Sequence, residues 1–303
     1  MTVENKPLYY GLDARTFQKP LADLTDTIAY KVQREAVKLM KPSFVAVDIY
    51  VMLRLVLKVY ELFFYLNADV RRQDPAWHIG YNAGILPLVR CMIDCLYNIT
   101  ALLENPGENG RYFRASGYRQ MLESISEDEK RYGGDPQWDA HNQERRKTVE
   151  LDMRVNHFTV DEVTNVRLWL TLGRYLREAP ATPNKAFLEK LTLGFWREYS
   201  GMAHATFNGL IPTAPFFAPR DIPEDLRKHF EDHADGMLSM HLLRVVGILL
   251  CILTEIQAHF RFEGANINER LVKGWHAVLA ALEIKELYDY RYDKLMKDRG
   301  IKS

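Results

Sequence analysis

The sequence predicts an all-α protein, a helical bundle of about seven to nine helices. Apolar residues recur every three or four positions over long segments, which is the period of a helix, and strand-like alternation is absent over any useful length. Glycine and proline gather at a few points between these segments, where they end helices. Of the 303 residues, 47% are hydrophobic and 26% are charged, a composition typical of a globular chain with a sizeable core.

The first half of the chain is divided by a few strong helix boundaries. Expected helices occupy residues 21–39, 42–67, 82–104 and 110–131. Pro42 suits the first turn of the second of these helices, because a first-turn residue has no helical partner for the N–H that proline lacks. The third helix is expected to end at Asn105-Pro106-Gly107, and the fourth at Gly133-Gly134.

Helix-start signals also organise the second half. Asp135 before Pro136 has the form of an N-cap followed by a first-turn proline. The segment 159–162 has the form of a capping box, and we expect it to open a helix that runs to about Glu178. Further helices are expected at 182–209, 221–262 and 269–299. The proline-rich loop 209–223 contains Phe216 and Phe217, which we expect to pack on the body of the protein.

These boundaries divide the chain into an N-terminal arm (1–41), a helical bundle core (42–262) and a C-terminal helix (263–303). The formal net charge is zero, which argues against a protein that coats nucleic acid through bulk charge but leaves room for a local basic site. No signal peptide is apparent, and the most apolar segment, 237–253, is too short and too polar for a membrane span. Three cysteines without a Cys-x-x-Cys motif fit a reducing compartment, so we expect a cytoplasmic protein without a membrane partner.

A stripe of polar residues interrupts the very apolar helix expected at 82–104. Arg90, Asp94 and Asn98 are spaced four apart, so they lie on one face of the helix. A buried charge needs a partner or a cleft beside it. Arg90 and Asp94 are therefore either a structural ion pair or part of a polar binding cleft, and the sequence leaves both interpretations open.

A second stripe lies on the helix expected at 182–209. Gly194, Arg197, Gly201, His204 and Asn208 recur at intervals of three and four, and hence share one face. Glycine inside a helix lowers the stability of the helix by about 1 kcal/mol relative to alanine, so glycines beside charged residues need a structural or functional explanation. Either the glycines let another helix pack closely while His204 is a hydrogen-bonded structural residue, or this face binds a ligand.

These two segments resemble the HEPN superfamily. Arg197, followed by six residues and then His204, is similar to the Arg-x(4–6)-His motif of that superfamily. The wider pattern resembles a set of uncharacterised bacterial helical proteins that pair an Arg-x-x-x-acid-x-x-x-Asn helix, here residues 90–98, with a later Tyr-Ser-x-x-x-His segment, here 199–204. The resemblance covers residues 80–210, roughly, and leaves the rest of the chain unexplained.

The resemblance implies an α-helical bundle with a HEPN-like core, often dimeric, whose active members cut RNA without a metal or other cofactor in stress or antiviral systems. Arg197 and His204 would be catalytic, because histidine transfers protons near neutral pH and arginine stabilises charge on a phosphate. Arg90, Asp94, Asn98, Tyr199 and Ser200 would contact the substrate.

The chain also departs from the superfamily pattern. A small polar residue usually follows the arginine, whereas this chain has Glu198, which repels phosphate. A spacing of this kind also arises by chance, as between Arg227 and His233. A non-catalytic helical module that binds a protein or a small ligand between the two striped helices therefore stands as the alternative.

Other patterns point to chemistry less strongly. Cys91 and Cys95 are four apart but lack a histidine that would complete a zinc site, and His229 and His233 lack the glutamate of a His-Glu-x-x-His motif, so no metal site is expected. The segment 111–119 mixes arginines with aromatic residues, either as a surface for nucleic acid or as an ordinary amphipathic helix.

Overall fold

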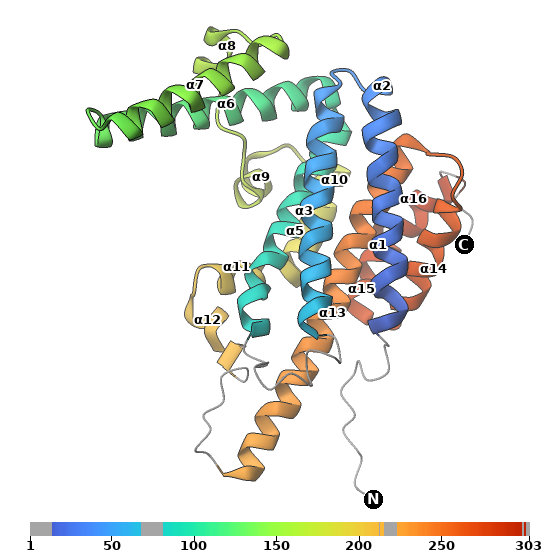
Figure 1. Cartoon of the computed structure of the whole chain (residues 1–303). Coiled ribbons are helices and arrows are strands. Elements are labelled where there is room, and N and C mark those ends of the chain that lie inside the picture. The colour runs from blue at the N-terminus through green and yellow to red at the C-terminus, as the bar shows by residue number, and fades with distance from the viewer. Residues whose placement is uncertain (1–13, 68–80, 212, 215–222, 299, 301–303) are drawn as a thin grey trace, which may run out of the picture.

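The computed structural model describes residues 14–67, 81–211, 213–214, 223–298 and 300. Within these ranges the regular structure is helical and contains no strand, which confirms the all-α prediction (Figure 1). Phe216 and Phe217, expected to pack on the body, lie outside the described residues.

Two helices form the centre of the bundle. Helix α5 (Tyr81–Glu104) packs against α3 (Phe44–Asn67) and α13 (Glu224–Phe260), and the side chains of α13 from Val245 to Leu253 are almost wholly buried. Both α5, over residues 83–104, and α13 are long and apolar enough to cross a membrane, but 67% and 72% of their most apolar windows are buried inside the fold. The core helices of a globular protein pass the same test of length and composition, so these two helices are weak evidence for a membrane span.

The two ends of the chain pack onto the same core. Helix α1 (Ala14–Lys31) continues through a π-helical turn (Val32–Ala36) into α2 (Val37–Leu39), and it lies against α3 and α14 (Ile267–Val278). Leu24 and Ile28 of α1 belong to one buried cluster with Trp275 of α14. Terminal segments that share a core in this way contribute to the stability of the whole bundle.

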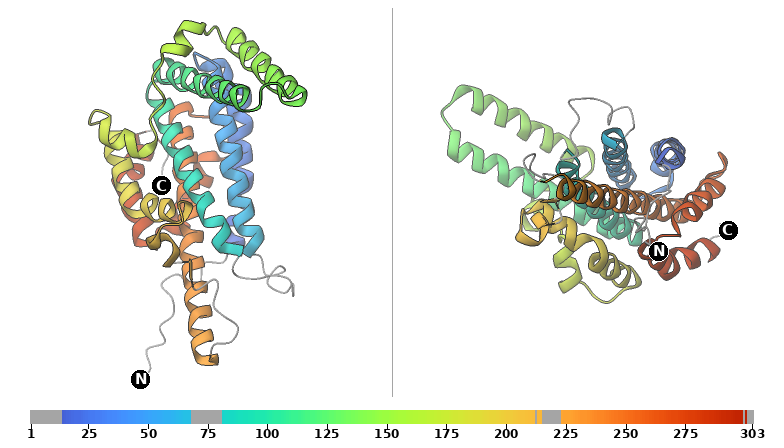
Figure 2. Two further views of the ribbon diagram at one scale, coloured as in Figure 1. Left: turned by 90° about the vertical axis from the view of Figure 1, so that its left-hand side faces the viewer. Right: turned by 90° about the horizontal axis from the view of Figure 1, so that it is seen from below.

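A helical hairpin of α6 (Pro106–Tyr132) and α7 (Pro136–Val155) extends away from the bundle (Figures 1 and 2). The predicted cap between these helices is confirmed: the Asp135 side chain accepts hydrogen bonds from the backbone N–H groups of Gln137 and Trp138, and Pro136 occupies the first turn. Ion pairs such as Arg145–Asp128 join the two helices, with an N–O distance of 2.7 Å.

The prediction of one continuous helix from 159 to about 178 is wrong, because the helix ends after its first half. Thr159 caps α8 (Val160–Asn165) as expected, but a separate helix α9 (Leu172–Glu178) follows an extended segment, 166–171. Other helices bind the backbone of this segment: the hydroxyls of Tyr97 and Tyr112 donate to its carbonyl groups, and its Trp169 N–H donates to Ser116. These tertiary hydrogen bonds replace the ones that a continuous helix would make.

The helix expected at 182–209 also ends early. Helix α10 (Pro183–Leu191), capped by Thr182, continues through a π-helical turn (Thr192–Trp196) into α11 (Arg197–Ala203). The chain then turns at Ala205, whose φ is 49°, into the short helix α12 (Phe207–Leu210). The turn folds α12 back on α11, where a Cβ on Gly209 would lie 2.2 Å from the carbonyl carbon of Gly201.

The single helix expected at 269–299 is divided as well. After α14, a turn leads into α15 (Leu282–Leu287), a π-helical turn (Tyr288–Tyr292) and α16 (Asp293–Asp298). The turn lets α15 pack closely on α13, where a Cβ on Gly247 would meet Ile284 at 2.5 Å. These divisions raise the number of helical segments above the expected seven to nine.

Candidate functional site

The two polar stripes meet in the structure at one residue of each, Arg90 and His204. The guanidinium of Arg90, on α5, lies 2.6 Å from Nε2 of His204 and 3.2 Å from Oγ of Ser200, at the end of α11. A guanidinium N–H can only donate, so Nε2 of His204 accepts and we assign the ring proton to Nδ1. A fixed positive charge and a neutral imidazole therefore lie side by side.

Arg90 is held by two further side chains. Its Nε lies 3.5 Å from a carboxylate oxygen of Asp94, one turn further along α5, and its guanidinium lies over the Trp196 ring at 5.3 Å from the centroid. Burial raises the pKa of Asp94, while Arg90 and the Trp196 indole act in the opposite direction. A carboxyl group with a perturbed pKa beside a cleft is a typical feature of functional sites.

Asn98, the third residue of the first stripe, has its amide orientation fixed. Its Oδ1 accepts a hydrogen bond of 2.9 Å from the indole N–H of Trp169. Trp169 lies in the extended segment 166–171 and packs against Tyr97 and Phe113. Because Oδ1 is engaged, the Nδ2 amide group of Asn98 is the side left to donate to a ligand.

A cavity of about 580 Å³ runs beside this stripe. Arg90, Asp94 and Asn98 line one wall, and Tyr97, Phe113 and Trp169 supply aromatic surface. A volume of this size lies within the usual range for sites that bind small molecules. The extended segment 166–171, which the sequence analysis expected to be helical, thus forms part of the wall.

The cavity is also lined by charged residues that the sequence analysis missed or placed elsewhere. Arg114 donates three hydrogen bonds to Asp48 of α3, at 2.9, 3.0 and 3.2 Å, and Tyr118 donates to Asp152 of α7 at 2.6 Å. Burial raises the pKa of Asp48, and Arg114 opposes that rise. The four-residue spacing of Arg114 and Tyr118 signals a shared helix face, but nothing local in the sequence links them to Asp48 or Asp152.

The arginines and aromatic residues of 111–119 are engaged inside the chain. Arg111 pairs with Glu162 at 2.7 Å, and Arg119 donates to the carbonyl of Val166 at 2.6 Å. These contacts attach α6 to α8 and to the segment after it. The arrangement matches an amphipathic structural helix more closely than an open nucleic-acid surface.

Arg197 of the second stripe and Tyr199, which the resemblance placed at the substrate, both lie apart from the contact with Arg90. Arg197 is exposed at the start of α11. Tyr199 is fully buried, and its hydroxyl is hydrogen-bonded to Nδ1 of His241 on α13 at 2.8 Å. Burial and the nearby Arg244 lower the pKa of His241 to about 3, so this histidine is neutral. Tyr199 therefore faces the core of the bundle.

Glu198, which departs from the HEPN pattern, is neutralised by a buried arginine. Arg244 of α13 donates to Glu198 at 2.6 Å and to both carboxylate oxygens of Glu283 on α15, at 3.0 and 3.1 Å. Its guanidinium also lies 5.1 Å from the centroid of the Phe195 ring. The negative charge of Glu198 is thus paired within the fold.

Gly201 has a packing role, as one of the two interpretations of the second stripe proposed. The backbone of Gly209 lies against it, at 3.5 Å from the position of a Gly201 Cβ. The close approach on this face is therefore between two segments of the chain. Asn208, the last residue of the stripe, is exposed on α12.

The described part of the chain offers few side chains that could bind a metal ion together. It contains no group of three or more histidine, cysteine, aspartate or glutamate side chains positioned to hold a metal ion. His229 and His233 are exposed on α13, whereas Cys91 is exposed and Cys95 is buried on α5.

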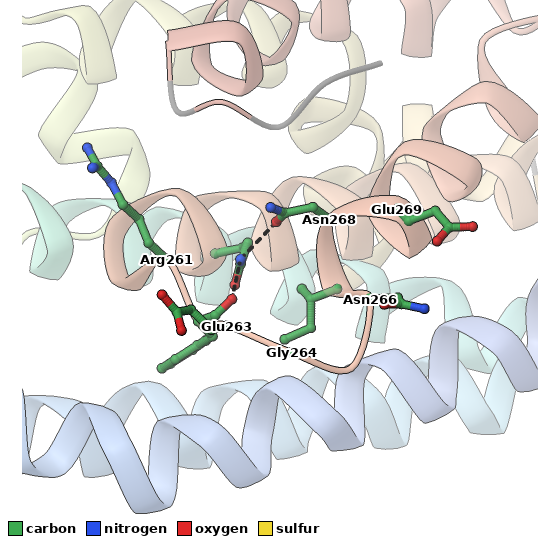
Figure 3. A pocket seen from close by; sticks show the side chains of 9 residues that line it. Arg261, Glu263, Gly264, Asn266, Asn268 and Glu269 are labelled. Carbon is green, nitrogen blue, oxygen red and sulfur yellow. Dashed lines mark hydrogen bonds between the residues drawn. The ribbon is translucent and has the colours of Figure 1, made fainter.

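A second cavity, of about 410 Å³, lies at the turn between α13 and α14 (Figure 3). Its charged side chains do not converge: Arg261, Glu263 and Glu269 point in different directions. The turn itself is shaped by left-handed backbone at Arg261, Ala265 and Asn266. The cavity beside Arg90, whose polar groups share one wall, is the stronger candidate for a binding site.

Comparison with known proteins finds no similar protein. No protein-family model, no curated protein and no solved structure matches this chain.

Proposed function

We propose that this protein is a metal-independent ribonuclease with a HEPN-like core. In this proposal His204 transfers the proton, while Arg90 and Arg197 bind the scissile phosphate. The observation that carries it is the contact between the Arg90 guanidinium and the His204 imidazole, at 2.6 Å. A proton carrier beside a cation can supply both proton transfer and charge stabilisation for the cleavage of RNA without a metal.

The proposed reaction uses the hydroxyl that RNA supplies. The phosphate enters between Arg90 and His204 and replaces their mutual contact, which frees Nε2 of His204. The imidazole then takes the proton of the ribose 2′-hydroxyl, and the 2′-oxygen attacks phosphorus as the bond to the 5′-oxygen breaks. The leaving oxygen takes a proton from water, and the hydroxide so formed takes the proton from the imidazolium, which restores neutral His204. The products are a 2′,3′-cyclic phosphate and a 5′-hydroxyl, and DNA, which lacks the 2′-hydroxyl, is not cut.

Two features of the site support this proposal. Glu198, which follows Arg197, is paired with Arg244, so its charge opposes phosphate less than the sequence implies. Arg197 is exposed at the start of α11, the helix that ends just before His204, and from there it can contact an extended RNA strand. The described residues offer no cluster of metal ligands from which a two-metal nuclease site would be built.

The test is RNA cleavage by the purified protein in the presence of EDTA. We expect cleavage to persist and to fall about 100-fold or more in His204→Ala, Arg90→Ala and Arg197→Ala. Matched controls are His233→Ala and Arg174→Ala, which remove an exposed histidine and an exposed arginine elsewhere and should leave cleavage unchanged. Mass spectrometry of the products should detect the cyclic phosphate.

The cavity favours a second candidate, a non-catalytic module that binds a small ligand. Its volume of about 580 Å³ and its mixed aromatic and polar lining suit such a role without any chemistry at His204. A folded protein that cuts no RNA would favour this candidate. Cleavage that EDTA abolishes and a divalent ion restores would instead contradict the metal-independent mechanism.

A further inference from the structure

The wall of the cavity beside Arg90 presents a definite pattern of hydrogen-bonding groups. Asp94 is an acceptor on both oxygens: Arg90, 3.5 Å away, and the Trp196 indole engage it in part, and its remaining lone pairs face the cavity that it lines. Asn98, one turn further on, has its carbonyl oxygen engaged by Trp169, so it presents its amide donors. Successive residues of the stripe thus offer acceptors and then a donor.

We propose that this cavity binds a guanine base, held by Asp94 and Asn98. The Watson–Crick edge of guanine carries two neighbouring donors, N1–H and the N2 amino group, beside one acceptor, O6. Asp94 would accept from both donors, and Asn98 would donate to O6. Adenine, cytosine and uracil each present a single donor group on this edge, so none of them satisfies both oxygens of Asp94 while also accepting from Asn98.

The aromatic residues of the cavity fit a planar ligand. Tyr97, Phe113 and Trp169 line it, and the bases of single-stranded nucleic acids commonly stack on aromatic side chains. Hydrogen bonds to the cavity-forming segment 166–171 hold this wall in place, including one of 2.9 Å from Tyr97 to the carbonyl of Leu170. A preformed aromatic wall binds a flat base with little loss of conformational entropy.

The position of the stripe links the base to the phosphate site. Along a helix, Asp94 lies about 6 Å and Asn98 about 12 Å beyond Arg90. A nucleotide whose phosphate contacts Arg90 therefore places its base beside these two residues. This step rests on the proposed ribonuclease function, which it deepens into cleavage next to guanosine, whereas guanine binding itself does not require cleavage.

The test is calorimetric titration of the full chain with 3′-GMP, 3′-AMP, 3′-CMP and 3′-UMP, together with DNA pentanucleotides d(TTGTT) and d(TTATT), which the proposed mechanism cannot cut. We expect guanine to bind about 5- to 150-fold more tightly than the other bases, the discrimination typical of one paired recognition contact. Preference in the pentanucleotides supports a guanine read from a strand, and preference confined to 3′-GMP supports a free nucleotide.

Variants locate the contact. Asp94→Asn removes an acceptor and should abolish the preference, and Asn98→Asp, which faces O6 with a carboxylate, should do the same. Asp152→Asn changes another carboxylate that lines the same cavity, one that accepts from Tyr118, and as the matched control it should retain the preference. Equal affinity for the four nucleotides, or no binding at millimolar concentration, overturns the inference even if RNA is cut. Guanine binding by a protein that cuts no RNA upholds it and overturns the ribonuclease.

Discussion

Replacement of Arg244 by alanine tests how the candidate site is supported. The Arg244 side chain is 8% exposed, and it is the shared partner of two carboxylates, Glu198 and Glu283, that are 25% and 27% exposed. Loss of one partner of a fully buried ion pair typically costs 3–5 kcal/mol, because the other charge is left unpaired. Since the carboxylates here keep some contact with solvent, we expect Arg244→Ala to lower the free energy of unfolding by about 2–4 kcal/mol.

Urea unfolding followed by circular dichroism measures this loss from the midpoint and the slope of the transition. The matched control is Lys273→Ala, which removes an exposed ion pair with Glu269 and should cost less than about 1 kcal/mol. A triple variant, Arg244→Met with Glu198→Gln and Glu283→Gln, should recover part of the stability because no buried charge remains unpaired. A loss in Arg244→Ala no larger than that of the control would refute the argument.

Two further predictions concern stability. The pKa of His241 is lowered from 6.5 to about 3, so as pH falls below about 6.5 the unfolded chain binds a proton that the folded chain does not. The free energy of unfolding of the native protein should therefore fall by up to about 1.4 kcal/mol per pH unit between pH 7 and pH 5. In urea titrations over this range, His241→Phe should show a smaller dependence on pH. Gly209→Ala places a Cβ 2.2 Å from the backbone of Gly201 and should cost about 2–3 kcal/mol, whereas Gly117→Ala, which has open space, should be neutral or stabilising in the same urea assay.

The helices could be predicted from the sequence because their signals are local. Asp135, Thr159 and Thr182 cap helices at the expected positions, and each does so with atoms only a few residues away. The interruptions at 166–171 and 279–281 could not be predicted in this way. They depend on hydrogen bonds and packing with helices far away in the sequence, which override a locally helical pattern.

The candidate site could be predicted in part for the same reason. Arg90 and His204 can be recognised from their own segments. Arg90 is a charged residue in a very apolar helix, and His204 shares a helix face with a glycine in the helix interior. Trp169 carries no such signal, since its role depends on a segment that leaves the helical path to reach Asn98. The sequence also grouped Tyr199 with the site, although its neighbours turn it toward His241.

The side chains of α11 and of the residue after it point in two directions, some toward the core of the bundle and some toward the candidate site. Glu198 and Tyr199 face α13, where Arg244 and His241 hold them in the interior. Ser200 faces α5, and so does His204 just beyond the last turn of the helix. Because the inward contacts do not involve Arg90, a phosphate that separates Arg90 from His204 leaves the anchoring of α11 intact. The contact that would open for a substrate is therefore not the contact that holds the helix in place.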